Sequence, residues 1–351
     1  MTDPYRPGAP EVPACGGAGP GRAGAAACPP PRGELTAALT EALAREPGRR
    51  RLPGRVLAER ADAYGDDLQL ALHLCYELHY RGWEGVDDGW EWDPGLLGLR
   101  QVLERRFLDA LRADAQGTGD AVQALEGLVR NRTDGPDVPR FLQHQGEWWH
   151  MREYAVHRSL YQLKEADPHA WMIPRLTGRA KAAFVTVEYE EFGAGRAERV
   201  HAELFAGLMR DLDLEDAYGH YAHAVPAVTL ATVNLMSLLG LHRARRGALA
   251  GHFAVLECTS PPGSRRLAET LRRLGAGAAA IGFYTEHVEA DAVHEQLVRH
   301  EFIGDLLAGE PALAQDVAFG IAATLWLEGR LSEHLLGAWK TGRSSLRAPL
   351  G

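Results

Sequence analysis

Apolar residues recur every three or four positions through most of this chain, and no stretch alternates apolar and polar side chains as a half-buried strand would. The pattern starts with Leu35, Leu39 and Leu43 and continues through the segments 68–78 and 141–339. This spacing matches the period of an α-helix that packs one face inward. We therefore expect an all-α fold, a helical bundle with an N-terminal helical extension.

Segments rich in glycine and proline divide this pattern into four parts. Residues 1–33 contain few large apolar side chains, so they are expected to form a tail that cannot bury enough surface to order itself. The turn-rich stretch 131–139 separates a helical extension over 34–138 from a domain over 139–342, and a short tail covers 343–351. Further breakers expected to end helices inside the domain are Pro168, Pro174, Gly193, Gly195, Pro261 and Pro262.

Charge and cysteine content exclude several classes of protein. The formal net charge is −9, so the chain has no overall attraction for nucleic acid or an anionic membrane. The most apolar stretch, 224–241, includes proline, threonine, asparagine and serine, which predicts a buried helix rather than a membrane span. Four cysteines without paired spacing, and an N-terminus without a signal pattern, favour a reduced, cytoplasmic protein.

Three potential metal ligands, His287, Asp291 and His294, follow one another at helical spacing. Positions i, i+4 and i+7 of an α-helix share one face, so these side chains are expected to point the same way. Two imidazoles and a carboxylate suit a transition metal such as iron or zinc. The segment predicts a metal site if other helices supply matching carboxylates.

Two further candidate ligands, Glu191 and His201, require a bend in the chain. On one straight helix, ten residues would separate them by about 15 Å, too far for one metal centre. Gly193 and Gly195 lie between them and permit a sharp break that returns His201 toward Glu191. Glu165 ends a helical run, where an acidic residue is disfavoured unless a cation compensates for it.

Other residues near these positions leave alternatives open. Glu188 and Glu190 adjoin Glu191, and Glu188 takes its place if the helix register differs. Glu257 follows a long apolar run and is interpreted as an acidic residue at a helix end, with a buried polar group facing the cavity as the alternative. Tyr161 is interpreted as core packing, with support of a ligand as the alternative. We assign no catalytic residue apart from the metal ligands.

The candidate ligands form an ordered set along the chain: Glu165, Glu191, His201, His287, Asp291 and His294. Their order and spacing resemble the haem-oxygenase-like di-iron oxidases and oxygenases, a family of iron-containing redox enzymes. The resemblance covers about 145–340 and includes the segments 173–175 and 251–257. It implies a haem-oxygenase-like bundle, two iron ions held by these six residues, O2 as co-substrate and a small organic substrate.

The same resemblance implies a range of reactions rather than one: N- or C-hydroxylation, desaturation or oxidative C–C cleavage. No motif for a nucleotide, flavin or nicotinamide is present, so the electrons are expected from an external donor. Two alternatives stay open, a mononuclear iron or manganese protein and a non-catalytic helical binding module. The region 34–135 is open to a docking role or to forming a homodimer.

Overall fold

The computed structural model describes residues 25–130 and 135–350, without the side chains of residues 289–293. Every regular element in this part of the chain is a helix, apart from one isolated bridge between Ala26 and Trp83. The prediction of an all-α fold is therefore confirmed. Among the described helices, none combines the length and apolar character needed to cross a membrane.

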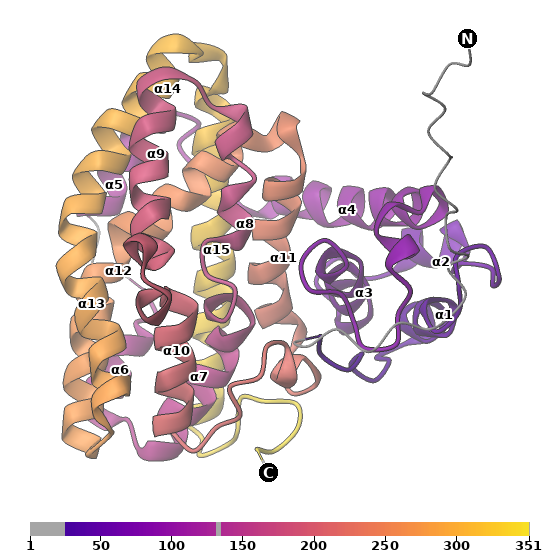
Figure 1. Ribbon diagram of the computed structural model, residues 1–351, viewed down its shortest axis with the longest axis horizontal. Coiled ribbons are helices and arrows are strands. Elements are labelled where there is room, and N and C mark those ends of the chain that lie inside the picture. The colour runs from indigo at the N-terminus through magenta and orange to yellow at the C-terminus, as the bar shows by residue number, and fades with distance from the viewer. Residues whose placement is uncertain (1–24, 131–134, 351) are drawn as a thin grey trace, which may run out of the picture.

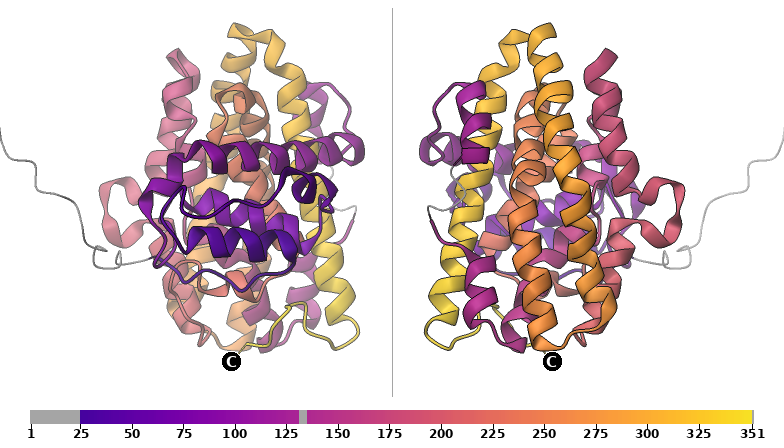
Figure 2. Two further views of the ribbon diagram at one scale, coloured as in Figure 1. Left: turned by 90° about the vertical axis from the view of Figure 1, so that its right-hand side faces the viewer. Right: turned by 90° about the vertical axis from the view of Figure 1, so that its left-hand side faces the viewer.

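The bundle occupies the larger part of the molecule (Figure 1). Its helices are α5 (Ala121–Arg130), α6 (Val138–Gln145), α7 (Trp148–Gln162), α8 (Asp167–Ala170), α9 (Gly178–Glu191), α10 (His201–Asp211), α11 (Ala227–Leu241), α12 (Arg246–Leu274), α13 (Ala278–Gln296), α14 (Gly304–Gly309) and α15 (Ala314–Trp339). A π-helical segment, Leu297–Ile303, joins α13 to α14. Helix α12 packs along both α13 and α15, and the right-hand view of Figure 2 shows α12 and α13 side by side.

Two glycines allow the backbones of α12 and α15 to touch. A Cβ atom added at Gly251 would lie 2.1 Å from the Val317 carbonyl oxygen, and one at Gly320 would lie 1.9 Å from the Ala248 oxygen. Real side chains never approach so closely, so only glycine fits at these crossings. The close contact fixes α12 against α15, and α12 also packs on α13, α6 and α11.

The structure corrects the expected helix limits around Pro261 and Pro262. We expected these prolines to end a helix, but α12 runs through both of them to Leu274. The break lies earlier, at the short turn Arg243–Arg245 between α11 and α12. Each proline removes one backbone hydrogen bond, and the packing of α12 on α13 and α15 holds the helix axis despite that loss.

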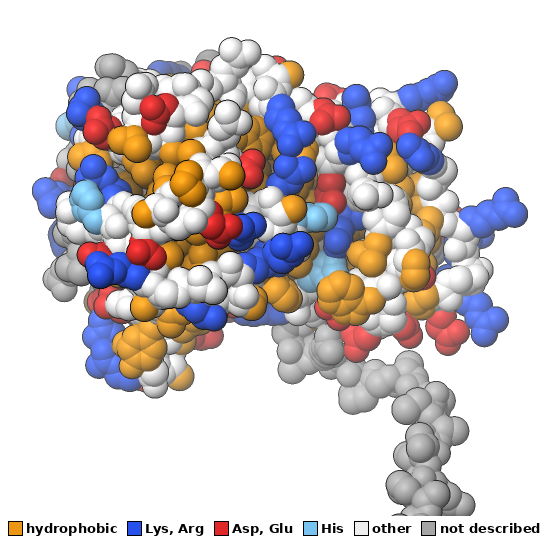
Figure 3. Space-filling view, turned by 90° about the horizontal axis from the view of Figure 1, so that it is seen from above, with side chains coloured by type: hydrophobic (Ala, Val, Ile, Leu, Met, Phe, Trp, Pro, Cys, Tyr) orange, Lys and Arg blue, Asp and Glu red, His pale blue; other side chains and the backbone are white. Residues whose placement is uncertain are grey.

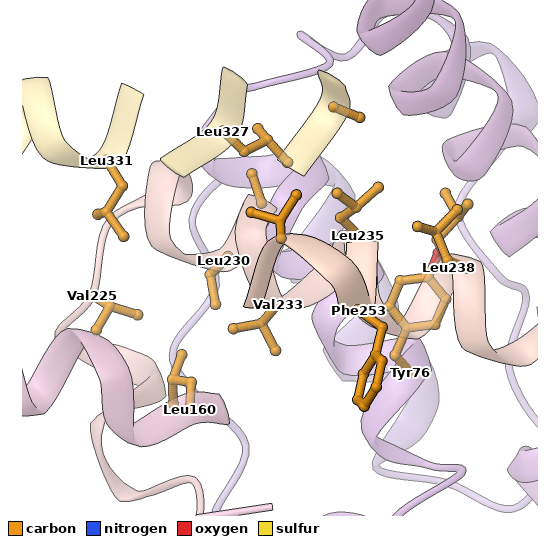
Figure 4. Close-up of a cluster of buried hydrophobic side chains, with 14 of the residues drawn as sticks. Tyr76, Leu160, Val225, Leu230, Val233, Leu235, Leu238, Phe253, Leu327 and Leu331 are labelled. Carbon is orange, nitrogen blue, oxygen red and sulfur yellow. The ribbon is translucent and has the colours of Figure 1, made fainter. Parts of the chain in front are cut away.

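A smaller lobe formed by residues 34–114 of the expected N-terminal extension lies across one face of the bundle (Figure 2, left), whereas α5 from the same stretch packs on α12 and α15. The elements of the lobe are α1 (Glu34–Leu43), α2 (Arg55–Arg60), α3 (Asp66–Glu77), the 3₁₀ turn Asp88–Trp92 and α4 (Pro94–Asp114). Helix α3 packs on α11, and Tyr76 of α3 reaches the buried side chains around Leu238 (Figure 4). One hydrophobic core therefore runs through both lobes.

Part of the predicted tail lies against this core. The side chain of Arg32 is almost fully buried, donates to the Ala222 carbonyl oxygen at 2.7 Å and pairs with Asp66 at 3.1 Å. Residues 1–24 of the expected tail are outside the described part of the chain, and the disorder expected there stays a prediction. On the face of the molecule in Figure 3, acidic and basic side chains are interspersed, with hydrophobic side chains visible between them.

Replacing Gly320 by alanine is expected to destabilise the protein by about 1–3 kcal/mol, because the new methyl group forces α15 away from α12. Gly329 lies on the same helix with no atom near its added Cβ, so Gly329→Ala is the matched control. That control is expected to be neutral or to stabilise the protein by about 0.5–1 kcal/mol. Urea denaturation measures both, and equal effects would contradict the close contact.

Candidate metal centre

Four of the predicted ligands meet inside the bundle. The nearest ligand atoms of Glu165, Glu191, His201 and His287 all lie within 4.8 Å of one another, and all four side chains are buried. They come from four separate elements: the turn after α7, the last residue of α9, the first residue of α10 and the middle of α13. Residues spread over more than a hundred positions therefore share one interior point.

Short distances connect the members of this cluster. His201 Nδ1 lies 2.6 Å from Glu191 Oε2 and 3.9 Å from Glu165 Oε2, and His287 Nε2 lies 3.7 Å from Glu165 Oε1. With its amide nitrogen facing Glu165, Gln162 donates to both carboxylate oxygens, at 2.6 and 2.9 Å. The arrangement is thus a compact set of oxygen and nitrogen donors.

The predicted bend between Glu191 and His201 is present. Gly193 and Gly195 have φ values of +78° and +81°, and Ala194 between them is also left-handed at +51°. A Cβ atom at Gly193 would lie 2.7 Å from the Val200 nitrogen, so the returning chain passes directly against this glycine. The loop ends α9 and starts α10 close enough for Glu191 to meet His201.

A second sharp turn presents Glu165. Ala166, directly after it, has φ +74°. Among the described non-glycine residues, only Ala166, Ala194 and Asp213 have positive φ. Such conformations are costly for residues with a Cβ atom and persist where the surrounding structure imposes them. Strained positions thus adjoin Glu165 and lie between Glu191 and His201, which is typical of functional sites.

A second cluster adjoins the first and shares Glu191 with it. Ligand atoms of Glu191, Glu257 and His294 also lie within 4.8 Å of one another, and all three side chains are buried. His294 Nδ1 lies 3.1 Å from Glu257 Oε2 and 3.9 Å from Glu191 Oε1. Glu191 therefore has carboxylate oxygens directed to both clusters.

The position of Glu257 corrects our interpretation of it as a helix-end residue. Because α12 continues through Pro261 and Pro262, Glu257 lies well inside the helix and faces its core side. A signal for this was available in the sequence, since charged residues are rarely buried unless they have a partner and Glu257 follows a long apolar run. We now include it among the candidate ligands.

The hydrogen bond of His287 defines which of its ring nitrogens is available to bind a metal ion. Its Nδ1 lies 2.8 Å from the Phe283 carbonyl oxygen, so this nitrogen carries the proton and donates. The lone pair is then on Nε2, the atom that faces Glu165. A backbone carbonyl that orients the second nitrogen is the usual arrangement of a metal-binding histidine.

Carboxylates surround His294 on both sides. Its Nε2 lies 2.6 Å from Glu190 Oε2, opposite the contact with Glu257. Burial alone lowers the pKa of His294, but the hydrogen bonds and charges of Glu257 and Glu190 outweigh burial and raise this pKa to about 9. Without a metal ion, a proton on His294 thus supplies the positive charge that balances the carboxylates.

The remaining predicted ligand, Asp291, lies on the same helix as His287 and His294. Asp291 belongs to α13, between His287 and His294, but its side chain is outside the described part of the structure. Its role as a ligand stays a prediction.

Glu188, the alternative to Glu191, belongs to neither cluster. Its side chain is 1% exposed, and neither carboxylate oxygen has a hydrogen-bond partner. Burial, together with the charges of Glu191 and Glu257, raises the pKa of Glu188 to about 9. Burial and the same group of carboxylates also raise the pKa of Tyr161 well above its usual value. Both groups therefore stay protonated beside the candidate ligands at neutral pH.

The donor set is larger than a single zinc site requires. A single zinc ion takes three or four protein ligands, usually with cysteine or histidine prominent. Here two adjoining clusters, rich in carboxylates, share one glutamate, and a carboxylate is able to bridge two cations. The arrangement is compatible with two iron ions and lies in the interior of a helical bundle, where such centres are built.

Comparison with known proteins assigns the family. A model of the family described as iron-containing redox enzymes matches residues 152–329, just over half of the chain. The protein belongs to this family, and the predicted resemblance is confirmed. The match spans all the candidate ligands and leaves the N-terminal extension outside it. No curated protein matches the chain.

Gly193→Ala is expected to lower both stability and metal affinity, because the methyl group meets the backbone of Val200 and pushes His201 away from Glu191. Gly195→Ala is the control, since it shares the positive φ but its Cβ would meet only the Tyr189 hydroxyl at 3.7 Å. Ferrous titration and urea denaturation measure the two effects. An equal loss of metal affinity in both variants would mean that the close passage at Val200 does not place His201.

Glu188→Gln is expected to change how the stability of the metal-free protein depends on pH. Since folding raises the pKa of Glu188 from 4.5 to about 9, its contribution to stability is complete at low pH and is lost as pH rises toward 9. The glutamine variant should therefore lose less stability between about pH 5 and 9. Urea denaturation across this range is the measurement, with the exposed Glu198→Gln as control. Parallel pH profiles for Glu188→Gln and the wild type would contradict the burial of an unpaired carboxyl group.

Proposed function

We propose that the protein is a non-haem di-iron oxidase or oxygenase that uses O2 to oxidise a small organic substrate. The observation that carries this proposal is the position of Glu191, which belongs to both buried clusters. A carboxylate shared between two donor sets is suited to bridge two cations. The membership in a family of iron-containing redox enzymes supports the identity of the metal.

The two clusters suggest how the ligands would be divided. Glu165, His201 and His287 would hold one iron ion, and Glu257 and His294 the other, with Glu191 between them. Asp291 is proposed as a further ligand from the same helix as the two histidines. Iron bound there would supply the redox chemistry and the binding of O2, while the protein supplies geometry and electrostatics.

In the metal-free protein, buried histidines hold protons that balance the charge of the neighbouring carboxylates. In the metal-free protein, burial lowers the pKa of His201, but the hydrogen bond and charge of Glu191 and the charge of Glu165 raise it above its ordinary value overall. His294 has a raised pKa of about 9 for the corresponding reason. Metal binding must displace these protons, so we expect iron affinity to fall as pH decreases.

We expected the mononuclear alternative to use His287, Asp291 and His294 with one glutamate, but His287 and His294 belong to different clusters, so this alternative would correspond to filling only one cluster. In that case Glu165, Glu191, His201 and His287 form the complete site, and His294 with Glu257 remains a protonated ion pair. Metal content separates the two proposals directly. The range of reactions belongs to the di-iron proposal and comes from the resemblance, whereas the external electron donor is proposed because the sequence has no flavin or nicotinamide motif.

Anaerobic titration with ferrous iron, followed by exposure to O2 with optical detection, tests the proposed function. We expect about two ferrous ions per chain and an absorption change that requires O2. Saturation at about one ion would favour the mononuclear alternative. Absence of binding would contradict both.

His201→Ala is expected to reduce the iron stoichiometry while the fold survives, because alanine keeps helix propensity but removes a nitrogen donor. His157→Gln is the control, since His157 is also a buried histidine but contacts Thr229 and Ser345, at 2.6 and 3.0 Å, instead of the clusters. Inductively coupled plasma analysis after anaerobic loading gives the iron content. Equal stoichiometry in the two variants would exclude His201 as a ligand.

A further inference from the structure

A buried ion pair joins the N-terminal extension to the residue that precedes Glu165. The ammonium group of Lys164 donates to the carboxylate of Glu77, the last residue of α3. The Lys164 side chain is 0% exposed and that of Glu77 is 3% exposed. Lys164 also lies 4.1 Å from the centre of the Tyr80 ring, a cation–π contact.

The carboxylate of Glu77 has further partners from both lobes. The Tyr218 hydroxyl, on the loop after α10, donates to it, and His73 Nδ1 lies 3.7 Å away. Burial raises the pKa of Glu77, but the charge of Lys164 and the hydrogen bonds from Lys164 and Tyr218 outweigh burial and lower this pKa overall. Glu77 is therefore an anion inside the protein, held by a complete set of partners.

The same lobe also contacts the backbone of the turn that bears Glu165. Arg81 donates to the Leu163 carbonyl oxygen at 3.3 Å, and its guanidinium group lies 4.2 Å from the centre of the Tyr218 ring. The turn itself is tight, with Asp167 N donating to the Lys164 oxygen at 3.1 Å and Ala166 at positive φ. Strain of this kind requires outside contacts to maintain it.

These contacts come from residues that the family match does not include, because Glu77, Tyr80 and Arg81 precede residue 152. We infer that the N-terminal extension supports the metal centre, with Glu77 as a positioning residue that holds the Glu165 turn through Lys164. This inference rests on the proposed function, in which Glu165 is an iron ligand. Glu77 itself touches none of the candidate ligands in the contacts described above.

The physical argument concerns the charge on Lys164. A buried ammonium group that loses its anion is strongly disfavoured, so it moves toward water. Since Lys164 and Glu165 are consecutive, such a movement rotates the turn and draws the Glu165 carboxylate away from His201 and His287. Loss of a group that orients a metal ligand commonly reduces metal affinity by about 10–100-fold.

Glu77→Gln tests the inference, because it keeps the shape of the side chain and removes its charge. The matched control is Asp66→Asn, on the same helix and at the same junction, where Asp66 pairs with Arg32 and accepts from Ala227 N at 3.1 Å. Ferrous affinity is measured under anaerobic conditions in the full chain. The visible absorption spectrum of bound Co(II) reports the ligand geometry without any requirement for activity.

We expect Glu77→Gln to weaken ferrous binding by about 10–100-fold and to change the Co(II) spectrum, whereas Asp66→Asn leaves both as in the wild type even if its melting temperature falls. Unchanged affinity and spectrum in Glu77→Gln, or equal changes in the two variants, would overturn the inference. If Glu77→Gln does not fold, Glu77→Asp replaces it, since it keeps the charge but shortens the reach to Lys164. An unaltered Co(II) spectrum in Glu77→Asp would then overturn the inference. A wild-type protein that binds neither metal would instead remove the proposed function.

Discussion

Carboxylates and imidazoles facing one another in the interior of a helical bundle are the constraint on which this structure depends. Such groups are costly to bury unless opposite charges or hydrogen bonds compensate them. In the metal-free protein, protonated histidines provide part of that compensation, as the raised pKa of His294 indicates. The surrounding helices must hold these groups together against their tendency to reach water. The close backbone contact of α12 with α15 supplies the rigid support from which Glu257 projects.

The same requirement accounts for the unusual backbone near the candidate ligands. A regular helix places residues along a line, whereas this site draws side chains from α9, α10, α13 and the turn after α7 to one point. The chain therefore reverses at Gly193–Gly195 and turns sharply at Ala166. The reversal and the turn each cost conformational energy. They bring Glu191, His201 and Glu165 together, whereas straight helices would separate these residues.

Local sequence patterns were sufficient to predict part of this arrangement. Helical periodicity predicted the all-α fold, and the glycines between Glu191 and His201 predicted the bend, because each effect acts over neighbouring residues. Glu257 was misjudged, since proline rules treat Pro261 as a helix end and take no account of the packing that carries α12 past it. The pairing of Glu77 with Lys164 joins positions far apart in the chain, and no spacing rule relates them. Both Glu188 and Glu191 face inward, and which of them meets His201 depended on the rotation of α9, which tertiary packing determines.

The two lobes share one continuous hydrophobic core, so neither lobe is complete without the other. Helix α3 covers α11 with apolar side chains, and Glu77 satisfies a charge that the bundle buries. A chain trimmed to the segment that defines the family would expose that apolar face and leave Lys164 an interior cation without an anion. The segment 152–329 matched by the family model therefore covers only part of one continuous hydrophobic core. Evolutionary exchange of the bundle alone would require new residues on α11 and at position 164, so the two lobes are expected to be inherited together.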